Sequence, residues 1–198
     1  MEDLRQTGLI DLRDAHLRYE PHFLDATAAD RLFIHLLAQV NWKEDRIRIF
    51  GKTYPQPRLT AVFGEQGKSY TYSGIQMLPT AFTPSLLDLK KKIEDLSGEH
   101  FTTCLLNLYR DGQDSNGWHA DNEKELGDQP FIASVSLGAS RTFHLKHRED
   151  RSLRFRMQLE HGSLLLMGGA MQESWLHQIP KTRKSVGKRI NLTFRKVY

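Results

Sequence analysis

His119 and Asp121 stand two positions apart, just after Trp118 in the chain. In a β-strand, side chains at positions i and i+2 point to the same side, so the imidazole and the carboxylate would converge on one point. One more imidazole from another strand would complete a face of two histidines and one carboxylate, which leaves open positions on non-haem Fe(II) for a small ligand and dioxygen. The alternative is an exposed histidine beside an aspartate, because this spacing also occurs by chance.

A second pattern covers residues 189–195, which alternate strictly between polar and apolar side chains. The polar positions are Arg189, Asn191, Thr193 and Arg195. An antiparallel strand with its polar face in water would explain the pattern. If the polar face instead lines the inside of a barrel, the two arginines need a doubly negative partner, and a dicarboxylic acid suits their planar guanidinium groups. The alternation does not distinguish these two interpretations.

A third pattern is the alternating segment 105–110, in which Asn107 and Tyr109 share a face. On an inner wall, an amide and a phenol could orient a bound acid through hydrogen bonds. Tyrosine in a strand also commonly packs in the core or at an edge, so the packing interpretation stays open.

Two segments that precede these patterns predict helices. Residues 25–40 begin at Asp25, a favourable N-cap. Residues 84–97 follow the capping residue Thr83, begin with a proline and end before Gly98. Both helices lie on the N-terminal side of the residues that could do chemistry.

Beyond residue 98, short apolar or alternating runs separated by turn signals predict eight strands. Their ranges are 101–110, 117–121, 132–137, 141–146, 153–159, 163–167, 175–179 and 189–197. This arrangement predicts a mainly β protein with flanking helices (α+β), a double-stranded β-helix or jelly roll with the two N-terminal helices packed outside. No repeat or linker divides the chain, so one domain over residues 1–198 is expected.

The composition limits what can hold a metal and where the protein acts. Cys104 is the single cysteine, which excludes disulfide frameworks and cysteine-rich metal modules, so a metal must be held by histidines and carboxylates. No apolar run predicts a membrane span, and the N-terminus shows no secretory signal, which favours the cytoplasm, or the nucleus in a eukaryote. Residues 181–198 hold seven basic side chains and no acidic one, which predicts a surface for a polyanion.

Together with a later histidine, His177, these patterns resemble the AlkB family of Fe(II)- and 2-oxoglutarate-dependent oxygenases. The likeness is greatest to the branch that repairs alkylated bases in double-stranded DNA, and it runs from about residue 23 to residue 198. It is carried by residues 49–52, 57–58, 70–74, 107–109, 133–136, 161–164 and 191–195. The resemblance implies an N-terminal arm over residues 1–22, helices and a nucleotide-recognition lid over 23–100, and a jelly-roll oxygenase core over 101–198.

The resemblance also implies the residues of the catalytic centre. His119, Asp121 and His177 would hold Fe(II). Arg189 would pair with the far carboxylate of 2-oxoglutarate, alongside Tyr109. The near end would be steadied by Asn107 and Arg195, and the pocket would be shaped by Asn191 and Thr193.

The implied reaction is oxidative removal of methyl groups from base nitrogens, as in 1-methyladenine and 3-methylcytosine. Dioxygen and 2-oxoglutarate would be consumed, and succinate, carbon dioxide and formaldehyde would be released. The base must leave the stack to be reached, which costs a few kcal/mol and less for a base that cannot pair. The implied partner is therefore nucleic acid, bound by a monomer.

Several residues match the family's substrate contacts. Tyr72 and His119 would sandwich the flipped base, and Glu123 would accept a hydrogen bond from its exocyclic amine. Phe50 would fill the gap that the base leaves. Glu123 could instead be a solvated loop carboxylate, and Phe50 a hairpin core residue.

The remaining implied substrate contacts lie in the lid and among the basic residues. Contacts with phosphates would come from Lys52 and Arg58 and from residues 181–188, including Arg183 and Lys184. The lid would add Tyr70 and Ser73.

Three departures from the double-strand branch leave the strandedness of the substrate open. Tyr72 replaces a phenylalanine, Asn122 replaces an acidic residue, and Thr182 interrupts a basic triplet. Single-stranded DNA or RNA therefore stays possible beside duplex DNA, since aromatic stacking serves either polymer. Two further alternatives are an oxygenase with a protein or small-molecule substrate and a basic nucleic-acid-binding module without catalysis.

Overall fold

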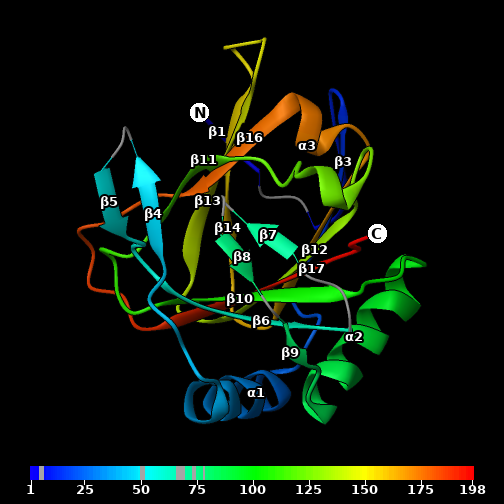
Figure 1. The fold of residues 1–198 in the computed structure, drawn as a ribbon. Helices are drawn as coiled ribbons and strands as arrows, with labels where there is room; N and C mark the ends of the chain where they lie inside the picture. Colours follow the sequence, from blue (N-terminus) through cyan, green and yellow to red (C-terminus); the bar gives the residue numbers. More distant parts are fainter. Residues whose placement is uncertain (5–6, 50–51, 66–69, 73–74, 78) are drawn as a thin grey trace.

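The computed structural model describes residues 1–198 except 5–6, 50–51, 66–69, 73–74 and 78, and it consists mainly of two β-sheets (Figure 1). The larger sheet has the strand order β2 (Gly8–Leu12), β3 (Ala15–Glu20), β15 (Ser163–Gly168), β12 (Ile132–Gly138), β17 (Arg189–Arg195), β10 (Thr103–Tyr109), β6 (Leu59–Gly64) and β9 (Thr80–Ala81). The smaller sheet has the order β1 (Glu2–Asp3), β14 (Arg154–Leu159), β13 (Arg141–His147), β16 (Trp175–Ile179) and β11 (Asn116–His119).

The remaining described elements are short hairpins and helices. The hairpins pair β4 (Arg46–Ile49) with β5 (Lys52–Pro55) and β7 (Tyr70–Tyr72) with β8 (Ile75–Met77). The helices are α1 (Ala26–Gln39), α2 (Pro84–Ser97), α3 (Met171–Ser174) and the 3-10 turn η1 (Lys124–Leu126). Among the described residues, none of these helices has the length and apolar character that crossing a membrane requires.

The C-terminal half confirms the predicted jelly roll. All eight predicted strands are present, as β10 to β17, with ends that differ by a few residues from the predicted ranges. They pair antiparallel, and β12, β17 and β10 lie side by side in the larger sheet. Strands adjacent in a sheet are often distant in sequence, as in the pairing of β10 with β17, so the larger sheet depends on long-range contacts.

The N-terminal segment, predicted only as an arm, contributes strands to both sheets. β3 pairs antiparallel with β15, and β1 pairs parallel with β14. Along β3, residues Ala15, Leu17 and Tyr19 are buried while the intervening side chains are more exposed. This period of two was a strand signal that the sequence analysis did not use.

Both predicted helices form with the predicted caps. Asp25 accepts a hydrogen bond from the backbone N–H of Ala28 at 2.8 Å, and Thr83 accepts one from Leu86 at 3.4 Å. Gly98 ends α2 with a φ of 73°, a left-handed conformation that favours glycine. The helices lie below the larger sheet in Figure 1, and their buried leucines join one core with the sheet's outer face.

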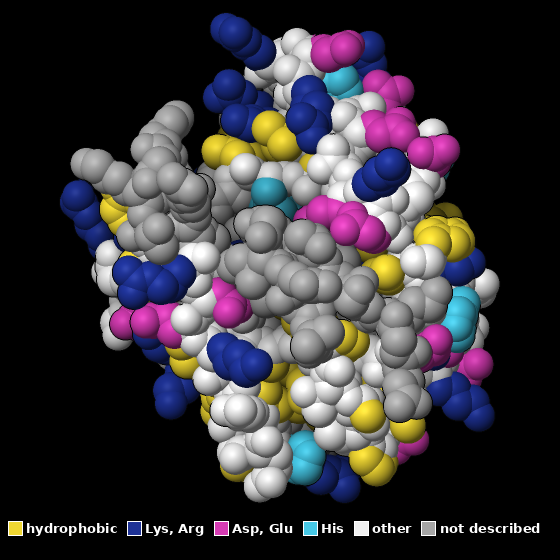
Figure 2. Space-filling view, in the orientation of Figure 1, with side chains coloured by type: hydrophobic (Ala, Val, Ile, Leu, Met, Phe, Trp, Pro, Cys, Tyr) yellow, Lys and Arg dark blue, Asp and Glu magenta, His cyan; other side chains and the backbone are white. Residues whose placement is uncertain are grey.

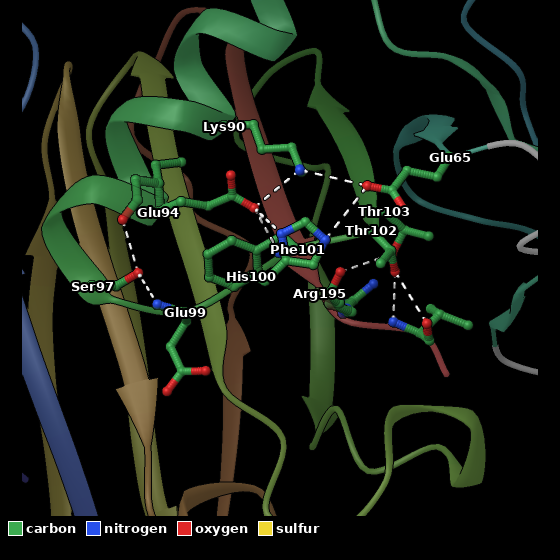
Figure 3. A network of polar contacts seen from close by, with 12 residues as sticks. Glu65, Lys90, Glu94, Ser97, Glu99, His100, Phe101, Thr102, Thr103 and Arg195 are labelled. Carbon is green, nitrogen blue, oxygen red and sulfur yellow. Dashed lines mark hydrogen bonds and ion pairs between the residues drawn. The ribbon is translucent and has the colours of Figure 1, made fainter.

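A partly buried network of charges also fastens α2 to the sheet (Figure 3). The Lys90 Nζ atom lies 3.0 Å from Glu94 and 3.6 Å from Glu65, and His100 Nδ1 lies 2.8 Å from Glu94. Glu94 also accepts a hydrogen bond from the backbone N–H of Phe101 at 2.9 Å. Because Glu65 follows β6 and Phe101 precedes β10, this network joins the helix to two strands of the larger sheet.

Candidate active site

His119, Asp121 and His177 meet between the two sheets. His119 ends β11 and lies opposite His177 of β16 in the strand register. Each of the three residues offers one ligand atom, and these atoms all lie within 4.8 Å of one another. The His119 side chain is only 25% exposed and that of Asp121 3%, so the alternative of an exposed histidine beside an aspartate is wrong for this pair.

The protonation states at this cluster suit a metal. Burial alone would raise the pKa of Asp121, but the charges of Arg195, His119 and His177 lower it from 3.8 to about 2. Burial and the charge of His119 lower the pKa of His177 from 6.5 to about 3. At neutral pH the carboxylate is therefore ionised and His177 is neutral, which are the forms that bind a cation.

Hydrogen bonds position two of these residues. His119 Nδ1 lies 2.8 Å from the Gly117 carbonyl oxygen, so it carries the proton and leaves Nε2 with its lone pair. Asp121 is positioned through its backbone N–H, which donates to the side chain of the fully buried Gln172 at 2.9 Å. His177 Nδ1 is buried without a hydrogen-bond partner among the described residues. A donor set of two imidazoles and one carboxylate fits Fe(II).

The polar face of β17 points into the space between the sheets. Ile190, Leu192 and Phe194 pack in the core that the larger sheet shares with α1 and α2, and all seven residues of the strand are buried. The orientation that the alternation left open is therefore inward, which brings Arg189 and Arg195 to the interior.

Arg189 is a buried cation with spare donors. It is 1% exposed, its Nη2 donates to Ser136 Oγ at 2.9 Å, and its guanidinium carbon lies 5.1 Å from the Tyr109 ring centroid. It forms no ion pair within the described part of the chain, where its Nε and Nη1 have no hydrogen-bond partner. Burial lowers the pKa of Arg189 from 12.5 to about 10, so it keeps its charge at neutral pH. These donors fit a carboxylate.

The other polar residues form the walls around these two centres. Asn191 donates to Ser134 Oγ at 2.8 Å and accepts from Thr193 Oγ1 at 3.1 Å, so the two predicted wall residues hold each other. Asn107 accepts a hydrogen bond from Arg58 Nε at 2.8 Å. Arg195 Nη2 lies 2.9 Å from Asp121 Oδ1, which pairs this arginine with a candidate metal ligand.

Comparison with known proteins identifies the family to which this chain belongs. The sequence matches the 2OG-Fe(II) oxygenase superfamily over residues 16–195. It is 43% identical over 187 residues to alpha-ketoglutarate-dependent dioxygenase alkB homolog 3 of Rattus norvegicus. This alignment covers 90% of this chain and 63% of the relative. The chain belongs to the AlkB family of 2OG-Fe(II) oxygenases.

Further AlkB-family relatives agree. DNA oxidative demethylase ALKBH2 of Mus musculus is 36% identical over 198 residues, covering 92% of this chain and 83% of the relative. The solved structure of OsALKBH1 matches with a TM-score of 0.65 over 96% of this chain and 100% of that chain, at 17% identity, which shows the fold. The chain spans just under two thirds of the length of the alkB homolog 3 proteins, 63% of the rat protein and 65% of the bovine one.

The residues predicted to hold Fe(II) and 2-oxoglutarate line one shared cavity. It is lined by every residue predicted for the metal and for 2-oxoglutarate: Asn107, Tyr109, His119, Asp121, His177, Arg189, Asn191, Thr193 and Arg195. Sequence reasoning missed other lining residues, which include Asn116, Ser134 and Gln178. Ser134 and Ser136 alternate with apolar residues in β12, a signal that could have indicated an inward polar face.

The structure describes only some of the residues predicted to contact the substrate. Phe50 and Ser73 lie outside the described residues, as do the side chains of Tyr70 and Tyr72 on β7. Glu123 precedes η1 and is half-buried with its Oε2 atom fully enclosed, unlike a solvated loop carboxylate.

The basic residues predicted to contact phosphates divide into two groups. Arg183 and Lys184 are exposed, as such a role requires. Arg58 is 4% exposed and donates hydrogen bonds to Asn107 and to the Ser115 carbonyl oxygen, so its phosphate contact stays a prediction.

Proposed function

We propose that this chain is an Fe(II)- and 2-oxoglutarate-dependent oxygenase that removes methyl groups from nitrogen atoms of nucleic-acid bases, with 1-methyladenine and 3-methylcytosine as substrates. The observation that carries the proposal is the shared cavity, in which the two histidines and Asp121 lie beside the buried cation Arg189. The names of the relatives, which include a DNA oxidative demethylase, support a nucleic-acid base as the substrate.

The proposed roles of the side chains follow from their positions. His119, Asp121 and His177 hold the iron, and Arg189 binds the far carboxylate of 2-oxoglutarate with Tyr109 at its side. When bound, iron and 2-oxoglutarate supply the oxidation of a C–H bond by dioxygen. Arg195 keeps Asp121 ionised and directs its carboxylate, and the apolar residues of the cavity exclude water.

The substrate side of the proposal concerns residues 23–100. We assign the hairpins β4–β5 and β7–β8, which lie in this range, to a lid that recognises the nucleotide. A flipped base would enter between this lid and His119, with Glu123 at its edge. After oxidation the hydroxymethyl group leaves as formaldehyde, and the base nitrogen is restored. Duplex DNA, single-stranded DNA and RNA are candidate partners, and the protein is proposed to act as a monomer.

The test is a demethylation assay with defined oligonucleotides. The protein is incubated with Fe(II), 2-oxoglutarate and an oligonucleotide carrying one 1-methyladenine, either alone or annealed at one fixed salt concentration. We expect formaldehyde, succinate and unmodified adenine in equal amounts. Succinate without repaired adenine would show that the substrate is of another class, such as a protein or a small molecule.

A further inference from the structure

The outer face of the smaller sheet carries an aromatic and several basic side chains next to the active site. Along β13 and β14, residues such as Phe143, Leu145, Met157 and Leu159 point inward and are buried. The outward positions are partly or fully exposed. We call the following outward set the outer basic face: Trp118, His144, Lys146, Arg154 and Arg156.

The basic residues of this face lie directly opposite one another. Lys146 pairs in register with Arg154, and His144 pairs with Arg156. Like charges on facing positions of neighbouring strands destabilise a sheet. Arg156 is neutralised by Asp3, whose Oδ1 lies 2.5 Å from its Nε, whereas no described carboxylate pairs with Lys146 or Arg154. The Lys146–Arg154 pair therefore places two positive charges side by side without a carboxylate among the described residues, which favours a negatively charged ligand.

Trp118 connects this face to the catalytic centre. It precedes His119 in β11, so the two side chains lie on opposite faces of the strand. Lys146 Nζ lies 4.3 Å from the centroid of the Trp118 ring, and the His144 ring centroid lies 6.3 Å from it. In the upper part of Figure 2, over the strands of the smaller sheet, Lys and Arg side chains lie around hydrophobic ones, with Asp and Glu side chains on the right of the same region.

We propose that the outer basic face binds a single nucleic-acid strand on one side of the substrate base, an inference that rests on the proposed function. Lys146 and Arg154 bind successive phosphates, and the base next to the substrate stacks on Trp118 once Lys146 turns to its phosphate. A positive surface with an aromatic residue is the combination that binds single strands without reading sequence. The occupant is single-stranded because bases in a duplex are not available for stacking on a side chain.

The test measures binding separately from catalysis. Fluorescence anisotropy with a labelled, unmethylated single strand of about 15 nucleotides gives the affinity over a series of salt concentrations. The variants are Lys146→Gln/Arg154→Gln and Trp118→Leu. The matched control is Lys91→Gln/Lys92→Gln, which removes the same charge from exposed positions of α2.

We expect a distinct signature for each variant. Losing two phosphate contacts should make the negative slope of log affinity against log salt shallower by about 1.4. Trp118→Leu should weaken binding roughly tenfold with an unchanged slope, since stacking releases no counterions. The control should bind as the unaltered protein does.

Two outcomes would overturn the proposal. One is a Lys146→Gln/Arg154→Gln variant with the slope of the unaltered protein. The other concerns a duplex of the same sequence. If Lys146→Gln/Arg154→Gln and Trp118→Leu lose as much affinity for the duplex as for the single strand, the occupant is double-stranded. A protein that binds as expected but does not demethylate would contradict the proposed function alone, because the binding strand carries no methyl group.

Discussion

Asp121 has two roles that can be separated by experiment. Its carboxylate is the proposed oxygen ligand of the metal, and it also neutralises Arg195, whose Nη2 lies 2.9 Å away while both side chains are 3% exposed. Removing one partner of a buried ion pair is strongly destabilising, whereas replacing both by apolar groups is often close to neutral. The metal role, by contrast, depends on the carboxylate alone.

Asp121→Ala should abolish demethylation and lower the free energy of unfolding by about 3 kcal/mol. The double variant Asp121→Ala/Arg195→Met should recover most of that stability and none of the activity. Urea unfolding and formaldehyde release are the measurements. Turnover by either variant would contradict the assignment of Asp121 as a metal ligand.

Arg189→Lys should raise the KM for 2-oxoglutarate about tenfold or more, because one ammonium group cannot reproduce the two parallel hydrogen bonds of a guanidinium. The value of kcat at saturating 2-oxoglutarate should fall less. The same exchange at the exposed Arg183 serves as the control and should leave this KM unchanged. An Arg189→Lys enzyme with the original KM would count against the carboxylate role.

At the scale of elements, α2 depends on the charge network around Lys90 (Figure 3). The Lys90 side chain is 10% exposed and lies between Glu94 and Glu65. Its loss leaves Glu94, which is 21% exposed, without its closest lysine, although His100 still lies 2.8 Å from it. Helix and sheet would then be held mainly by their shared leucine core.

Lys90→Ala should therefore lower the free energy of unfolding by about 1 to 3 kcal/mol, because a partly buried carboxylate loses its partner. Lys91→Ala on the exposed side of the same helix should change it by less than about 0.5 kcal/mol. Urea titration followed by circular dichroism measures both. Equal effects from the two variants would mean that the network does not fasten the helix.

At the scale of the whole molecule, the buried metal ligands make stability depend on pH. His177 has a folded-state pKa of about 3 against an ordinary value of 6.5, so between these values the unfolded chain binds a proton that the folded chain does not. The contribution of His177 to the free energy of unfolding is therefore complete above the ordinary pKa of 6.5, and it is lost as the pH falls toward the folded-state pKa of about 3. Asp121 acts in the same direction below its ordinary value of 3.8.

The metal-free protein should lose stability steadily between about pH 7 and about pH 4, and His177→Leu should flatten that dependence. The measurement is the midpoint of urea unfolding at several pH values in the presence of a chelator. An exposed histidine such as His35 offers the control, since His35→Leu should leave the slope as it was. A steeper slope in His177→Leu would contradict a buried neutral imidazole.

Local patterns in the sequence determined the parts of this protein that depend on neighbouring residues. The caps Asp25 and Thr83 and the glycine after α2 set both helices, and alternation identified the C-terminal strands. The spacing of His119 and Asp121 places both side chains on one side of the chain. Each of these features depends on φ and ψ preferences and hydrogen bonds within a few residues.

Tertiary structure alone decided which faces meet. The alternation in β17 is the same whether its arginines point inward or outward, and only the burial of Ile190 beneath the helices turns Arg189 toward the cavity. His177 became the third member of the metal cluster because β16 lies beside β11, and the pairing of Arg195 with Asp121 joins β17 to the opposite sheet. Such pairings depend on the free energy of burying whole surfaces between distant segments, which no short stretch of sequence contains.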